Sequence, residues 1–255
     1  MTDTTAPPAL SAPSARLAGS PSAPSTRLAG SPSAFQRARS PEQKALRRAA
    51  ILDAARRLAV EHGVRNVSLG DIAKAVGLTK SNVLRYFETR EDIYLQLAAD
   101  GYRVWTEWVI ERLRGAERFV PAELAAALAE GLANDPLFCD LLSDAPASLE
   151  HNVSTEAVRT FKYAVVGAMD QLAGVLTNLP AGLSPAQARD VLVGTTVLAT
   201  GLWPWSNPPP VLASLYATDP PLRQAKIEFA PEVRRLTEAL INGVMAPVTQ
   251  QHSVC

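Results

Sequence analysis

The sequence predicts an all-α protein in which a small N-terminal head precedes a larger helical body. Between residues 68 and 90, two short segments with N-capping residues are joined by a turn that contains glycine. After residue 104, proline and glycine separate several segments that are long enough to form helices. Two helices joined by such a turn form a helix-turn-helix, so we expect a three-helix, homeodomain-like head built on this motif.

Residues 1–39 have a composition that does not favour a folded structure. They are rich in serine, proline and alanine, and the octapeptide R-L-A-G-S-P-S-A occurs twice, at Arg16–Ala23 and Arg27–Ala34. Such a segment buries too little apolar surface to offset chain entropy, so we expect a disordered low-complexity tail. Its arginines leave two interpretations open: a basic arm that supports binding by the head, or, more simply, a dispensable tail or a start codon assigned too early.

The first helix of the head is expected to run from Ser40 to Gly63. Ser40-Pro41-Glu42-Gln43 has the signature of a capping box with proline at the first helical position. Basic residues in the first turns oppose the helix dipole. A compensating contact with phosphate and a solvated basic face are equally open interpretations for Lys44, Arg47 and Arg48.

The helix-turn-helix itself is predicted from its caps and its apolar spacing. Ser68 is followed by Asp71 at the spacing of a capping box, and Gly77 ends this helix where a left-handed backbone favours glycine. Thr79 is placed to cap the second helix, which we expect over residues 80–87. In a helix-turn-helix the second helix lies in the DNA major groove, so this stretch predicts DNA binding.

On the second helix, Val83, Leu84 and Phe87 are expected to face inward. The remaining residues form the predicted recognition surface: Lys80, Ser81, Asn82, Arg85 and Tyr86. Asparagine pairs with adenine and arginine with guanine in the major groove, so Asn82 and Arg85 are the predicted base readers. The predicted phosphate contacts are Ser68, Thr79, Lys80, Tyr86 and Arg90.

The distribution of charge supports this interpretation although the net charge is zero. Residues 37–90 contain 12 Lys or Arg against 5 Asp or Glu, a net charge of +7, and residues 104–255 contain 10 against 16, a net charge of −6. A basic head on an acidic body is expected when only the head contacts phosphate.

The segment from Arg48 to Leu97 resembles the tetracycline-repressor (TetR) family of bacterial transcriptional regulators. The matching residues are Ile51-Leu52, Ala54-Ala55, Gly63, Val67-Ser68, Ile72-Ala73, Gly77-Leu78-Thr79, Tyr86-Phe87, Arg90-Glu91-Asp92 and Ile93. The resemblance implies a DNA-binding domain at residues 40–103 and an effector-binding and dimerisation domain at residues 104–248. It also implies a homodimer that binds a palindromic double-stranded DNA operator, represses nearby genes and is released by a small apolar or amphipathic ligand.

Two residues depart from the family pattern. Leu84 stands where the family usually has an aromatic residue, commonly tyrosine, and Arg85 stands where an aromatic residue or histidine is frequent. The first change removes one expected phosphate contact, and the second leaves the operator sequence open. Leu84 also supports an alternative, in which a helical sensor dimer no longer reads specific DNA and acts through a ligand or a protein partner.

The body is expected to contain helices at residues 121–134, 137–143, 154–179, 185–202 and 231–245. The stretch Trp203–Pro210 contains four prolines, which predicts a rigid loop. Aromatic residues with a few polar neighbours are typical of a ligand pocket, although at helical spacing they also fit a core. The predicted ligand contacts are Trp105, Trp108, Phe138, His151 and Phe161.

The helices at residues 185–202 and 231–245 are the predicted dimer interface. Gly194, Thr195 and Ala199 are small enough to let two helices approach closely. The resemblance places the last two long helices of each subunit in a four-helix interface. Packing within one chain is the alternative.

Several function classes find no support in the sequence. No apolar run reaches the roughly 18 residues of a membrane span, and no basic start precedes an apolar stretch as in a signal peptide. Cys139 and Cys255 fit neither a disulfide framework nor a metal site, so we expect a cytoplasmic protein without cofactor or metal. We expect no enzyme, because catalytic motifs are absent and the three histidines are far apart.

Overall fold

The structure of the protein, a computed structural model, describes residues 41–247. Within that range the chain forms helices, turns and loops without a β-strand, so the predicted all-α fold is confirmed. The predicted tail at residues 1–39 and the predicted N-cap Ser40 lie outside the described residues. No helix between residues 41 and 247 combines the length and the apolar character that crossing a bilayer requires.

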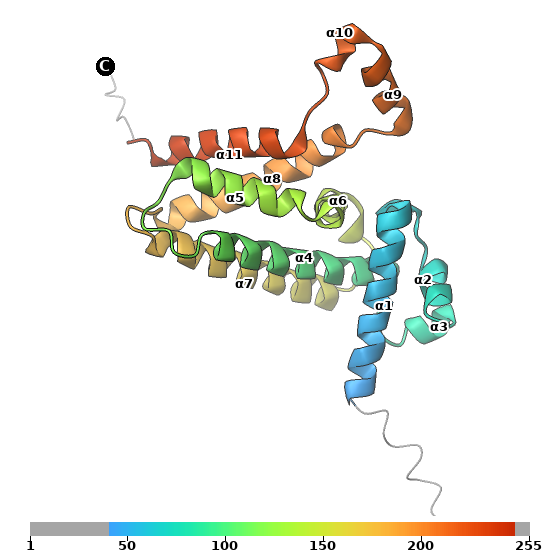
Figure 1. The fold of residues 1–255 in the computed structure, drawn as a ribbon. Helices are drawn as coiled ribbons and strands as arrows, with labels where there is room; N and C mark the ends of the chain where they lie inside the picture. Colours follow the sequence, from blue (N-terminus) through green and yellow to red (C-terminus); the bar gives the residue numbers. More distant parts are fainter. Residues whose placement is uncertain (1–40, 248–255) are drawn as a thin grey trace, which may run out of the picture. The chain divides into compact units, whose positions relative to one another are not determined.

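The head is built from α1 (Pro41–His62), the short turn η1 (Val64–Asn66), α2 (Leu69–Ala75) and α3 (Lys80–Val83) (Figure 1). Gly63 ends α1 with a backbone φ of 82°, a left-handed conformation that glycine adopts at little cost. The chain then turns through η1, and α2 packs against α1. The head therefore contains the predicted pair of short helices beside a long first helix.

The helix α4 (Arg90–Arg112) belongs to both the head and the body. Thr89 caps it, because its hydroxyl accepts a hydrogen bond from the backbone amide of Asp92 at 3.1 Å. Ile93, near its start, is buried in the head, whereas Trp105 is buried in the body. Because one continuous helix crosses the domain boundary that the sequence predicts between residues 103 and 104, a tilt of α4 would displace the head from the body.

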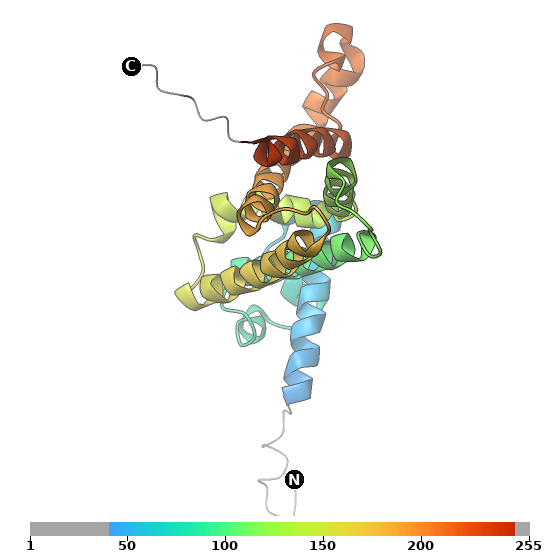
Figure 2. The same cartoon turned by 90° about the vertical axis from the view of Figure 1, so that its left-hand side faces the viewer.

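The remaining long helices form the body around the second half of α4. α7 lies along α4, and α11 packs against both α5 and α8 (Figures 1 and 2). These elements agree within a few residues with the five predicted helices. Their bounds are α5 (Pro121–Ala133), α6 (Pro136–Asp144), the short turn η2 (Ala145–Leu149), α7 (Thr155–Asn178), α8 (Pro185–Ser206) and α11 (Phe229–Met245).

The predicted rigid loop at Trp203–Pro210 is wrong in its first half. α8 continues through Pro204 and ends only at Ser206. A proline in the last turn removes a single backbone donor, and the amide of Asn207 closes that turn on the carbonyl of Trp203 at 3.0 Å. The break in the helix therefore falls at the prolines that follow residue 207.

Between α8 and α11 the chain forms two short helices that the sequence does not predict. These are α9 (Pro210–Thr218) and α10 (Pro220–Arg223), and neither contains a buried residue. Both views show them projecting from the remaining helices (Figures 1 and 2). Each begins with proline, which is compatible with the first turn of a helix.

Two hydrophobic clusters stabilise the fold. The first fills the body and includes Trp105 and Phe138. The second fills the head around Phe87 and also includes Leu141 of α6 and Phe161 of α7. Because residues from both regions share the second cluster, the head is packed on the body and is not merely tethered to it.

An ion pair adds a second link between the head and the body, on the side of α6. Nε of Arg65 in η1 lies 2.8 Å from Oδ1 of Asp144, whose side chain is only 5% exposed. A nearly buried carboxylate is costly without a partner, so this pair favours one position of the head against α6. Among the described residues, α7 makes no corresponding ion pair or hydrogen bond to the head.

Candidate nucleic-acid interface

The predicted capping box at the start of α2 is confirmed. The Ser68 hydroxyl accepts a hydrogen bond from the amide of Asp71 at 3.3 Å, and the Asp71 carboxylate accepts one from the Ser68 amide at 2.9 Å. The same carboxylate accepts from the Ser68 hydroxyl at 2.6 Å, and these hydrogen bonds hold the pKa of Asp71 below its ordinary value. The Ser68 hydroxyl thus stabilises α2, although its residue stays exposed.

The turn between α2 and α3 also follows the prediction. Gly77 has a φ of 66°, the left-handed region in which a side chain would be strained. The Thr79 hydroxyl then accepts from the amide of Asn82 at 3.3 Å and caps α3. These caps fix the direction in which α3 leaves the turn.

The second helix is shorter than predicted. α3 is regular only over Lys80–Val83, and residues 84–86 form turns instead of the expected helix to residue 87. The amide of Tyr86 bonds the carbonyl of Val83 at 2.8 Å, an i→i−3 pattern that tightens the end of the helix. We call residues 80–88 the recognition segment.

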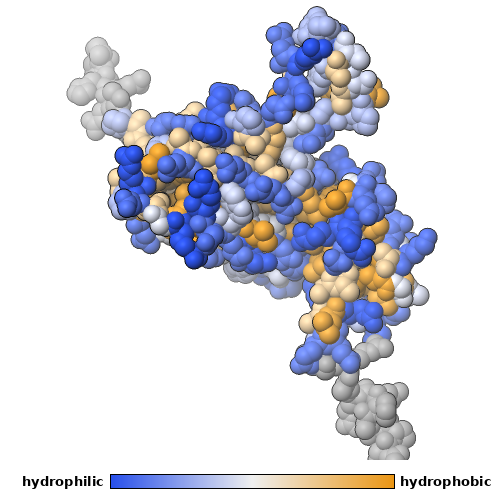
Figure 3. All heavy atoms as spheres, in the orientation of Figure 1, coloured by the Kyte–Doolittle hydropathy of each residue, from blue (hydrophilic) through white to orange (hydrophobic). Residues whose placement is uncertain are grey.

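Tightening the segment changes which of its residues face inward. Val83 and Phe87 are buried as expected, but Leu84 is 47% exposed, so its predicted inward position is wrong. The regular helix ends directly before residue 84, and the tighter turn carries this side chain out of the core. Leu84, Leu46 and Val60 are the largest exposed apolar side chains of the head, where Figure 3 shows apolar surface among hydrophilic residues.

The polar face of the recognition segment is open to solvent. The exposed residues are Lys80, Ser81, Asn82 and Arg85, and Tyr86 is half-buried. The side chains of Asn82 and Arg85, the two predicted base readers, make no hydrogen bond or ion pair with any described residue. Both are therefore available for an external partner.

Lys80 is positioned by a glycine of the neighbouring helix. A Cβ atom at Gly70 would lie 2.6 Å from Cε of Lys80 and 3.2 Å from its Nζ, so the lysine side chain runs directly over the start of α2. In the sequence, only the glycine inside a short helix points to this contact, and the contact is not among the predictions.

Arg90 has a different place from the one that the sequence predicts. Its guanidinium points inward and donates to the carbonyls of Val64 and Val67. It also pairs with Glu91 at 3.0 Å and lies over the ring of Tyr94, 4.6 Å from the centroid. We therefore assign Arg90 to the packing of η1 against α4 and remove it from the set of phosphate contacts.

Arg48 makes a similar contact on the other side of the recognition segment. Its guanidinium donates to the carbonyl of Tyr86 and lies over the Phe87 ring, 4.1 Å from the centroid. The sequence suggests only a basic face for this residue. In the structure it anchors the recognition segment on α1.

The five predicted ligand contacts of the body do not form one cavity. Trp105 and Phe138 are buried in the body core, where the indole of Trp105 donates to the carbonyl of Leu128 at 3.2 Å. Trp108 is half-buried against that core, His151 is exposed, and Phe161 belongs to the cluster of the head. The predicted grouping is wrong because aromatic spacing along single helices does not reveal which core each helix faces.

The small residues of α8 serve first to pack the helices of one chain. A Cβ atom at Gly194 would lie 2.4 Å from a side-chain atom of Leu240 in α11, and the hydroxyls of Thr195 and Thr237 lie 3.4 Å apart. The opposite face of α8 remains bare, with Val193, Val197 and Trp205 exposed. We call these three residues the α8 outer face.

Comparison with known families covers most of the described chain. Residues 51–97 match the model of bacterial regulatory proteins of the tetR family. Residues 99–248 match the model of the tetracyclin repressor-like C-terminal domain. The two models meet within α4, the helix that is common to the head and the body.

One curated relative is similar over a short part of the chain. It is the HTH-type transcriptional regulator AcrR of Shigella flexneri, which is 39% identical over 61 residues. That match covers 24% of this chain and 28% of the relative, so the chain aligns with little more than a quarter of the length of AcrR.

Two solved structures share the fold over most of their length. One is the multidrug binding protein EbrR complexed with imidazole, at 18% identity and a TM-score of 0.52, covering 80% of this chain and 97% of that one. The other is FadR of Thermus thermophilus, a transcriptional repressor in complex with lauroyl-CoA, at 20% identity and a TM-score of 0.51, covering 80% and 98%.

Proposed function

The chain belongs to the tetR family of bacterial regulatory proteins, and we propose that it acts as a homodimeric repressor of nearby genes. Proteins of this family are DNA-binding transcriptional regulators and not enzymes. In our proposal, residues 40–103 bind a palindromic operator, and residues 104–248 bind a small apolar or amphipathic effector that releases the DNA.

The observation that carries the proposal is the exposed polar face of the recognition segment, on which the side chains of Asn82 and Arg85 have no partner among the described residues. Asn82 and Arg85 are assigned to base edges and Lys80, Ser81 and Tyr86 to the phosphates beside them. Ser68 and Thr79, which are exposed at the starts of α2 and α3, are assigned to further phosphates of the DNA backbone. The basic charge of the head provides the attraction that precedes these contacts.

The α8 outer face supports the dimer. Val197 is 64% exposed on a regular helix, and Gly201 on the same helix has no atom within 4 Å of the place of its Cβ. A glycine inside a helix costs about 1 kcal/mol relative to alanine, and no residue between 41 and 247 packs there to compensate. The α8 helix of a second subunit could pack against Val197 and approach closely at Gly201. α11 packs beside α8 in the same chain.

Binding of the purified protein to DNA from immediately upstream of its own gene, at two salt concentrations, tests the proposal. We expect a palindromic footprint and an affinity that falls steeply with salt, because each neutralised phosphate releases counterions. Weak binding that is indifferent to sequence would lead to a genome-wide selection of bound fragments. If no fragment were enriched, the alternative of a sensor whose head no longer reads DNA would replace the proposal.

A further inference from the structure

A cleft with a volume of about 300 Å³ lies at the junction of the head and the body. It is lined by the recognition segment from Leu84 to Glu88 and by the first half of α7 between Glu156 and Ala164. α4 lines it between Asp92 and Ala99, and α1 contributes Arg48. Its volume is at the lower limit of known small-molecule sites, about 300–1,000 Å³.

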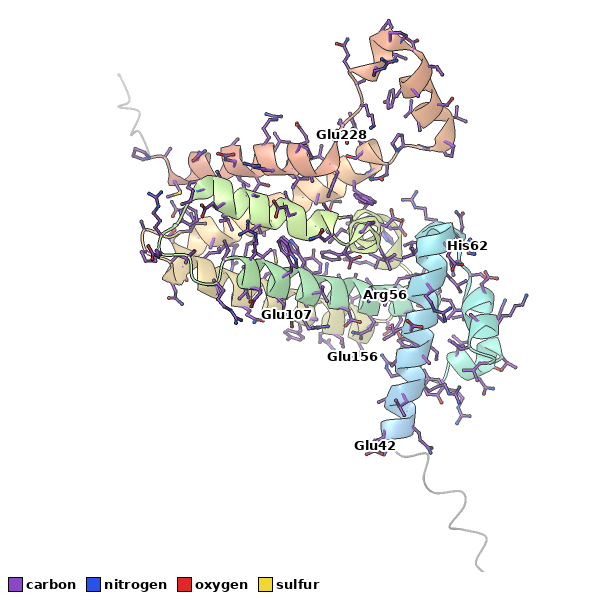
Figure 4. The ribbon with its side chains drawn as sticks, in the orientation of Figure 1. Glu42, Arg56, His62, Glu107, Glu156 and Glu228 are labelled. Carbon is purple, nitrogen blue, oxygen red and sulfur yellow. The ribbon has the colours of Figure 1, made fainter. Side chains whose placement is uncertain are left out.

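The cleft lies on the α7 side of the junction, where no polar contact between described residues links the head to the body. On the side of α6 the head is held by the Arg65–Asp144 ion pair. On the side of α7 the described residues provide no ion pair or hydrogen bond, and Glu156 lies at the end of α7 toward α1 (Figure 4). A molecule in the cleft would therefore contact both regions at their less constrained side.

The cleft contains both acidic and basic side chains: Glu156 pairs with Arg159, whereas Glu88, Asp92 and the exposed Arg85 have no ion pair among the described residues. Among the lining residues, Arg48 is already occupied by the Tyr86 carbonyl and the Phe87 ring. Asp92 accepts a single hydrogen bond, from the amide of Glu88 at 3.0 Å, and burial raises the pKa of its carboxyl group. A positive charge beside the carboxylates of Glu88 and Asp92 would be favourable.

The other groups of the cleft are mainly apolar. Phe161, Leu95 and Ala99 come from the two long helices, and Leu84 and Tyr86 come from the recognition segment. Aromatic rings attract cations as well as apolar groups. The lining therefore fits a molecule with an apolar body and one positive charge.

We propose that this junction cleft binds a small amphipathic organic cation, such as an aryl- or alkylammonium ion. The ammonium group lies toward Glu88 and Asp92, and the apolar part lies against Phe161 and Leu95. Arg85 stands at the rim, since it lines the cleft and also belongs to the face that we assign to DNA. Binding of the cation in the cleft does not depend on the proposed function. Only its effect on DNA binding rests on that function.

Binding in the cleft would control the position of the recognition segment. A cation between this segment and α7 would bind some orientations of the head relative to the body more tightly than others. Because a ligand shifts a conformational equilibrium only by such a difference in affinity, it would favour the orientations that bind it best. We expect the cation to weaken DNA binding, because Arg85 and Tyr86 line the cleft and also belong to the face that we assign to DNA. By linkage, DNA must weaken cation binding by the same factor.

The first test is calorimetry on the full chain without DNA, using three probes of similar size and different charge. These are 2-phenylethylammonium, 2-phenylethanol and 3-phenylpropanoate. We expect a Kd below about 1 mM for the cation and binding at least about tenfold weaker for the other two. Equal binding of all three, stronger binding of the anion, or no binding of the cation up to about 10 mM would overturn the proposal.

Two variants locate the site. Ala157→Trp on α7 would fill the cleft from the body side and abolish cation binding, whereas Ala116→Trp in the turn after α4, also half-buried, should leave it intact. Glu88→Gln should lower the affinity for the cation by about tenfold and leave the affinity for the alcohol unchanged. Melting curves establish that each variant is folded. Retention of cation binding by a folded Ala157→Trp protein would place the ligand elsewhere and refute the assignment.

A parallel titration of DNA binding separates the two proposals. If the cation binds as expected but the protein binds no DNA, the cleft stands and the regulator function fails. If DNA binds in a salt-sensitive way and the cation does not bind, the regulator stands and the cleft assignment fails.

Discussion

The recognition segment of the head and the outer face of α8 in the body are both exposed, but they are chemically opposite. The first presents Lys80, Asn82 and Arg85, and the second presents Val193, Val197 and Trp205. Polar side chains are stable in water without a partner, whereas a contiguous apolar patch marks a surface that another molecule covers. In the proposed function, the head therefore binds a reversible partner, the DNA, and the body a lasting one, the second subunit.

This difference also predicts how each association responds to solution conditions. An interface formed by Lys and Arg with phosphate weakens steeply as salt rises, while burial of apolar surface depends little on screening. Salt should therefore release the DNA from the protein and leave the dimer assembled. The following substitutions test the comparison.

The largest effect is expected for Val197→Asp on the α8 outer face. A carboxylate buried in an interface costs several kcal/mol after relaxation, so the dissociation constant of the dimer should rise by at least about 100-fold. Analytical ultracentrifugation of both proteins measures it. The control is Val211→Asp on α9, a residue that is 85% exposed and outside that face. If Val197→Asp remained dimeric, α8 would not be the interface.

Arg90→Ala should have the next largest effect, on stability. The substitution removes the hydrogen bonds from a charged group to the carbonyls of Val64 and Val67, and hydrogen bonds to charged groups contribute about 1.5–3 kcal/mol each. Urea titration should show a loss of about 3 kcal/mol in the free energy of unfolding, the lower end of the sum for the two bonds. Arg85→Ala, five residues earlier, should unfold like the unmodified protein. Equal stability of the two variants would contradict the inward role of Arg90.

Arg85→Ala should instead act on sequence recognition. Losing a bidentate contact with guanine costs about 1–3 kcal/mol of discrimination at one base pair of each half-site. Binding to a library of operators with single substitutions measures this loss. Arg112→Ala removes the same charge from an exposed position on the body and should leave the preference intact. An unchanged preference in Arg85→Ala would exclude it as a base reader.

Lys80→Ala should have the smallest effect, and the effect should be the same for all DNA sequences. The slope of log K against log salt should become shallower by about 0.9 for each lysine removed, about 1.8 for a dimer. Fluorescence anisotropy at several salt concentrations gives the slope for specific and random DNA. A change confined to specific DNA would instead make Lys80 a base reader.

The sequence predicts local structure in this protein better than long-range contacts. Ser68 and Thr79 cap their helices as predicted, because a cap depends on residues only three positions apart. The length of α3 and the exposure of Leu84 depend on how Arg48 and Phe87 hold the segment against α1. No local pattern contains that information.

The same limit applies to the candidate sites. Exposed Asn82 and Arg85 follow from helical spacing, but the inward turn of Arg90 depends on carbonyls 23 and 26 residues away. The sequence groups Phe161 with Trp105 and Phe138, and packing assigns them to different clusters. The junction cleft is formed by α1, α4, α7 and the recognition segment together, so only the tertiary structure reveals it.

At Gly70, the stability of the head and its proposed binding to DNA favour different residues. Replacing it with alanine would favour α2 by up to about 1 kcal/mol on helix propensity alone, and the new methyl group would displace only the flexible end of Lys80. A screen for thermal stability would therefore select Gly70→Ala. The same substitution would weaken binding to the operator, because it displaces Lys80. If Lys80 contacts phosphate as we propose, selection for regulation would act in the opposite direction and retain glycine, because the lysine side chain runs over this position.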